Sequence, residues 1–83
     1  MKLREKLTNT IRIQLECELD TNLKNVLTDA KTLNERLNRG ETENALQQIE
    51  ELEKRLKDME NIAEKNDIKI HCYAVYEELR ELI

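Results

Sequence analysis

Residues 42–66 read TENALQQIEELEKRLKDMENIAEKN, and they carry the clearest periodic pattern of the chain. Apolar residues recur there at alternating steps of four and three, which places their side chains on one face of an α-helix. They are Ala45, Ile49, Leu52, Leu56, Met59 and Ala63, with Leu46 and Ile62 on the flanks. The opposite face is charged, and Thr42 has a side chain suited to a helix N-cap. We therefore predict an amphipathic helix over residues 42–66.

The preceding segment repeats this spacing and predicts a second helix over residues 21–38. Its apolar residues are Leu19, Leu23, Val26, Ala30, Leu33 and Leu37, with Leu27 beside them. Gly40, the only glycine, follows directly and can adopt the left-handed conformation that ends a helix. A loop this short makes consecutive helices antiparallel. Residues 21–40 are net basic and residues 41–66 net acidic, which also favours a helical hairpin.

The C-terminal segment carries a third apolar stripe and predicts a helix over residues 68–83, with Asp67 as its N-cap. The stripe consists of Ile68, Cys72, Val75, Leu79 and Leu82, with Tyr76 and Ile83 beside it. Because it continues to the last residue, we expect this end of the chain to be docked against another surface.

The N-terminal segment, residues 1–19, fits two interpretations. Leu3, Leu7, Ile11, Leu15 and Leu19 recur every four residues, which indicates a helix whose apolar side drifts around its axis. From Ile11 to Leu19, however, apolar and polar residues alternate strictly, as in a half-buried strand. The alternative is an α+β fold, in which short antiparallel strands at 10–19 and 68–75 pair at the base of the hairpin. Isolated two-stranded ribbons are weak in water, so we favour a mainly α fold in one small domain, 1–83.

The composition agrees with long helices, and it speaks against a nucleic-acid-binding, membrane-spanning or exported protein. The chain of 83 residues has no proline and only two aromatic residues, both tyrosines. Its net charge of −4 speaks against general affinity for nucleic acid. No apolar segment is long enough to span a bilayer, and Met1 to Leu15 lacks the apolar centre of a signal peptide. Two cysteines without an export signal are typical of reduced thiols in a cytoplasmic protein.

The residue types that carry chemistry do not form a recognisable motif. His71 and Cys72 are adjacent and Cys17 is distant, whereas structural zinc sites usually show ligand pairs at short spacing. We expect Cys72 in the core and His71 exposed, with no catalytic, cofactor or metal site, and hence no enzyme. The alternative is a small ligand or metal bound between subunits around these three residues and Tyr73.

A second alternative is weak nucleic-acid binding through a basic face of the helix at 21–38. The residues concerned are Lys24, Lys31, Arg36 and Arg39. Their mixed surroundings favour a simpler role, in which they pair with the acidic helix of the hairpin.

The surplus of apolar residues near both chain ends points to macromolecular partners. Burying apolar surface contributes about 25 cal/mol per Å², so an uncovered stripe favours association. We expect a non-catalytic protein–protein interaction module that forms a homo-oligomer, most simply a dimer. It would act on another protein as a regulator, inhibitor, adaptor or assembly chaperone. The predicted contact residues are Leu3, Leu7, Ile11, Leu79, Leu82 and Ile83.

Overall fold

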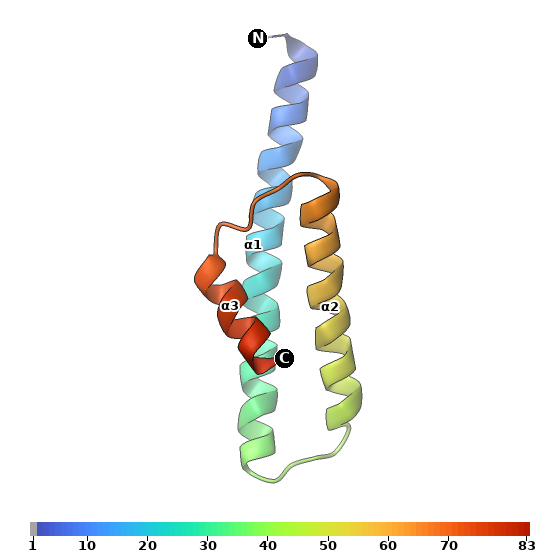
Figure 1. The fold of residues 1–83 in the computed structure, drawn as a ribbon, viewed down its shortest axis with the longest axis vertical. Helices are drawn as coiled ribbons and strands as arrows, with labels where there is room; N and C mark the ends of the chain where they lie inside the picture. The colour runs from blue at the N-terminus through green and yellow to red at the C-terminus, as the bar shows by residue number, and fades with distance from the viewer. Residues whose placement is uncertain (1) are drawn as a thin grey trace.

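The structure, a computed structural model, describes residues 2–83 and contains three α-helices in that part of the chain. They are α1 (Leu3–Asn38), α2 (Ala45–Lys65) and α3 (Tyr73–Leu82). Helix α1 packs against both of the others: α2 runs antiparallel beside it, and α3 lies obliquely across it (Figure 1). The mainly α prediction is confirmed. The α+β alternative is wrong, because residues 2–83 contain no strand.

The N-terminal segment is not a separate element but the beginning of α1, which runs for 36 residues without a break. The predicted boundary between 1–19 and 21–38 therefore does not exist. The alternation after Ile11 is not a burial pattern, because Ile13 and Cys17 are exposed whereas Leu19 is buried. A strand needs a neighbour for its backbone groups, whereas a helix satisfies them internally.

The core is an aliphatic seam along α1, and both apolar stripes of the predicted hairpin point into it. From α1 it takes Leu19, Leu23, Val26, Leu27, Ala30 and Leu33. From the rest of the chain it takes Ala45, Leu52, Leu56, Met59, Ala63, Ile68 and Leu79. No buried side-chain polar atom among the described residues lacks a hydrogen-bond partner. Burial of apolar surface is therefore the main force that holds the three helices together.

The turn after α1 is built on Gly40, as predicted. Gly40 has φ +80°, its amide donates to the carbonyl of Leu37, and the amide of Glu41 donates to the carbonyl of Arg36. These two bonds form a Schellman motif, which satisfies the free carbonyls at a helix C-terminus. The next helix begins later than predicted: Thr42 is not its N-cap, because Asn44 adopts a left-handed conformation (φ 58°) and α2 starts at Ala45.

The connection from α2 to α3 differs from the prediction of a helix over 68–83. Asp67 is not an N-cap; with φ 52° it occupies the left-handed position that ends α2. The amide of the next residue, Ile68, donates to the carbonyl of Ala63 at 2.8 Å, and the Ile68 side chain is buried. A second Schellman motif thus ends α2 with its usual apolar contact. Residues 68–72 then pack on the core without helical structure, and α3 begins at Tyr73.

The N-terminal end of α1 extends beyond the other two helices, as Figure 1 shows in blue. Every residue from 3 to 14 is exposed, and burial begins only at Leu15. We call residues 3–14 the overhang. As part of α1 it contributes to the length of the molecule, which is 57 Å against 20 and 14 Å in the other two directions.

Candidate interaction surface

The overhang carries three of the six predicted contact residues, and all three are exposed. The exposed fraction falls along the helix, from 84% for Leu3 to 60% for Leu7 and 46% for Ile11. Residues four apart on a helix are offset by about 40°, so this row turns steadily away from the core as it approaches the N-terminus. The row therefore continues the core seam of α1 onto a surface that neither α2 nor α3 covers.

The three contact residues predicted at the C-terminus lie differently. Leu79 is fully buried against the core of its own chain, so the prediction that it lies at a contact surface is corrected. Ile83 is partly buried against the same core, and Leu82 is 38% exposed. The apolar stripe of the C-terminal segment therefore serves to pack α3 against α1 of the same chain. A sequence pattern cannot distinguish docking within one chain from docking onto a partner.

The basic residues proposed for nucleic acid are largely engaged within the chain. Lys31 forms an ion pair with Glu78 of α3 at 3.0 Å, and Arg39 pairs with Glu41 at 3.3 Å. Arg36 donates to Gln48 of α2 at 3.0 Å. These contacts agree with a structural role, although the acid that Lys31 meets is on α3 rather than on the predicted acidic helix.

Charge pairing between residues 21–40 and 41–66 includes one ion pair of the opposite sense to the one predicted, beside the pairs that Arg36 and Arg39 form with Glu41. Arg55 of α2 donates to Asp29 of α1 at 2.7 Å, so here the base is on the acidic helix. These residues line a shallow groove between the two helices together with Arg36 and Gln48. Arg36 bonds to Gln48 and Arg55 to Asp29 across this groove, and we assign it no ligand.

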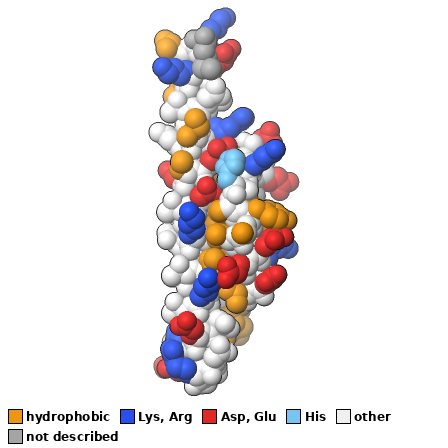
Figure 2. Space-filling model, turned by 90° about the vertical axis from the view of Figure 1, so that its left-hand side faces the viewer, with side chains coloured by type: hydrophobic (Ala, Val, Ile, Leu, Met, Phe, Trp, Pro, Cys, Tyr) orange, Lys and Arg blue, Asp and Glu red, His pale blue; other side chains and the backbone are white. Residues whose placement is uncertain are grey.

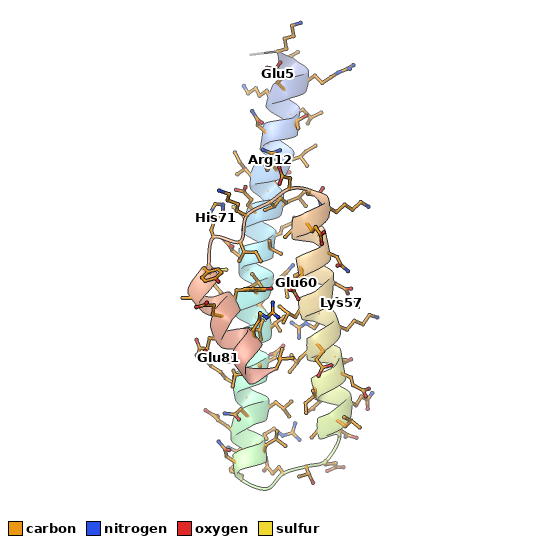
Figure 3. All side chains as sticks on the ribbon, viewed as in Figure 1. Glu5, Arg12, Lys57, Glu60, His71 and Glu81 are labelled. Carbon is orange, nitrogen blue, oxygen red and sulfur yellow. The ribbon has the colours of Figure 1, made fainter. Side chains whose placement is uncertain are left out.

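The residues considered for a metal or ligand do not converge. His71 lies 3.3 Å from the carboxylate of Glu16, beside α1 (Figure 3), and Cys72 donates to Asp20 at 3.3 Å. Cys17 is exposed elsewhere on α1. Among residues 2–83, no three His, Cys, Asp or Glu side chains are close enough to hold a metal ion. His71 and Cys72 instead attach the segment 68–72 to α1.

A polar network that the sequence did not reveal joins α3 to α2. The hydroxyl of Tyr76 donates to Glu60, which Figure 3 shows directed from α2 toward α3. Arg80 donates to the same hydroxyl at 3.2 Å and lies 3.6 Å from Glu60. Burial and the hydrogen bond to Glu60 raise the pKa of Tyr76. The spacing of Tyr76 and Arg80 on one helix face was the only available signal, since the position of Glu60 depends on tertiary packing.

The two cysteines should differ in reactivity. Burial, followed by the hydrogen bond and the charge of Asp20, raises the pKa of Cys72, so less of its reactive thiolate is present near pH 8. Cys17 is exposed. We expect iodoacetamide to alkylate Cys72 more slowly than Cys17, as measured by peptide mass spectrometry. Asp20→Asn should accelerate the reaction of Cys72, and equal rates for the two native thiols would contradict the described environment.

Comparison with protein-family models, with curated proteins and with solved structures finds no match for this chain. None of the helices within residues 2–83 combines the length and apolar character needed to cross a membrane. Hydrophobic side chains are visible on the protruding end as well as on the body of the molecule (Figure 2). The overhang is thus the surface on which a functional interpretation has to rest.

Proposed function

We propose that this chain is a non-catalytic protein–protein interaction module that assembles with itself, most simply as a dimer. In that form it occupies a surface of another protein, as a regulator, inhibitor, adaptor or assembly chaperone does. The observation that carries the proposal is the overhang, a helical segment with four exposed large apolar residues, three of which are the predicted contacts Leu3, Leu7 and Ile11.

Two physical arguments support a partner for the overhang. A helix of this length is marginal in water by itself, and most helices in proteins are stabilised by packing of an apolar face. Leu3, Leu7 and Ile11 are exposed and do not belong to the core that the described residues form. Full burial of a Leu or Ile side chain contributes about 1.5–3 kcal/mol, so covering this row would favour association by several kcal/mol before entropy is counted.

The solution mass tests this proposal directly. We expect light scattering after size exclusion, at low micromolar concentration in reducing buffer, to give about twice the chain mass of 9.9 kDa. Leu7→Asp should restore the monomer, because a carboxylate would have to be buried at the contact. Leu46→Asp is the matched control, since Leu46 is 71% exposed on α2, away from the overhang. A monomeric wild type would contradict self-association. If Leu7→Asp and Leu46→Asp had the same solution mass, the contact would lie outside the overhang.

A further inference from the structure

The exposed side of α1 carries a stripe that includes Leu7 and Ile11 of the predicted contact row but does not follow that row into the core. Arg4, Leu7, Ile11, Gln14 and Glu18 follow one another at steps of three and four, so they share one face of the helix. All five are exposed. We call this face the outer stripe. It begins in the overhang and ends beside the first turns of α1 that α2 and α3 cover.

The two ends of the outer stripe carry opposite charge. Residues 2–6 contain three bases and one acid, whereas residues 16–20 contain three acids and no base. The centres of these two blocks are about 21 Å apart along the helix axis. Leu7 and Ile11 lie between them, so the stripe is basic at one end, apolar in the middle and acidic at the other end.

One residue of each charged block lies on the outer stripe. It is Arg4 in residues 2–6 and Glu18 in residues 16–20. Glu16 and Asp20 face the segment 68–72, where they contact His71 and Cys72. Arg4 and Glu18, in contrast, form no ion pair with any other residue from 2 to 83. Both are exposed.

We propose that the partner of the overhang is the outer stripe of a second copy of this chain, with the two α1 helices antiparallel. The proposal rests on the proposed function and specifies its self-association. A two-fold axis passes near Ile11, so the apolar middles of the two stripes cover each other. The basic end of each copy then lies against the acidic block of its partner, and Arg4 faces Glu18 twice.

Charge decides the direction of the two helices. In an in-register parallel pair, Arg4 of one copy would meet Arg4 of the other, and Glu18 would meet Glu18. Like charges in contact disfavour a complex, whereas complementary charges select partner and register. The outer stripe is complementary only to an antiparallel copy of itself. Because these charges are exposed, added salt should weaken the dimer.

Charge reversal tests the register. We expect Arg4→Glu and Glu18→Arg each to weaken dimerisation by about ten-fold, because each substitution places like charges together at two symmetric positions. The double variant Arg4→Glu/Glu18→Arg should recover the wild-type dimer. An equimolar mixture of the two single variants should form a heterodimer, measured by sedimentation equilibrium with reductant present. An acidic residue in the first turn suits the helix dipole, so Arg4→Glu should not unfold the overhang.

Lys57→Glu and Glu53→Arg on the exposed face of α2 are the matched controls, and neither should change the dimer. If the wild type is a monomer, both the self-association and this inference fail. If the wild type is a dimer and the single variants dimerise as it does, the proposed function stands but the antiparallel pairing is overturned. The pairing would also be overturned if the double variant did not recover dimerisation although circular dichroism showed it to be folded.

Discussion

Replacing Leu23 by Ala should lower the free energy of unfolding by about 3–5 kcal/mol, one of the two largest effects that we expect in this chain. Leu23 is one of the largest fully buried side chains and lies in the α1 seam that α2 and α3 cover. The substitution removes apolar surface and leaves a cavity between helices that are themselves held by apolar contacts. Urea unfolding followed by circular dichroism measures the change.

The measurement has a matched control on α2. Leu46→Ala makes the same chemical change at a largely exposed position, so the free energy of unfolding should change by about 0.5 kcal/mol or less. Small domains are stable by only about 5–15 kcal/mol, so Leu23→Ala should remove a large part of the total. Equal midpoints for the two variants would show that the seam does not lie where the structure places it.

Leu79→Asp should release α3 from α1. Leu79 is the only fully buried residue of α3, whose remaining attachments are half-buried apolar side chains and surface polar contacts such as Lys31 with Glu78. An unpaired carboxylate at this position would cost several kcal/mol to bury. We expect lower helical content and new protease cleavage within residues 66–72, while the α1–α2 hairpin persists.

Leu82→Asp separates this effect from disruption of a surface contact. Leu82 lies on the same helix but is partly exposed, so its replacement should leave α3 docked and reduce stability less. If Leu79→Asp left both helical content and the unfolding midpoint unchanged and altered only the solution mass, Leu79 would be a contact residue after all. The structure predicts instead that Leu79→Asp releases α3, and therefore lowers the helical content and the unfolding midpoint.

Much of the hairpin was predictable because its signals are local. The four-three spacing from Leu19 to Leu33 and from Ala45 to Ala63 identifies the buried faces correctly. Gly40 identifies the turn, since the left-handed conformation there favours glycine. At the candidate contact surface, Leu3, Leu7 and Ile11 were found by their constant steps of four, and all three are exposed.

The errors occurred where one local pattern is compatible with two structures. Asp67 suits an N-cap and also tolerates the left-handed position at the end of a helix, and burial of Ile68 against the core favours the second. The strand proposed at 68–75 in the α+β alternative is instead a non-helical segment, residues 68–72, followed by the first residues of α3. Alternation is typical of a half-buried strand, but residues 11–19 alternate within α1, and the pattern contains no information on whether another strand is available.

The sequence by itself determined that helices form and which of their faces are apolar, because the period of apolar residues and the turn residues act within a few positions along the chain. Only the tertiary structure decided which apolar faces are covered. Leu79 and Leu7 both belong to apolar rows at helical spacing, yet Leu79 is buried where α3 packs on α1, whereas α2 ends before it reaches Leu7. Exposure depends on the lengths and positions of other elements, and these are set by packing between residues far apart in the chain.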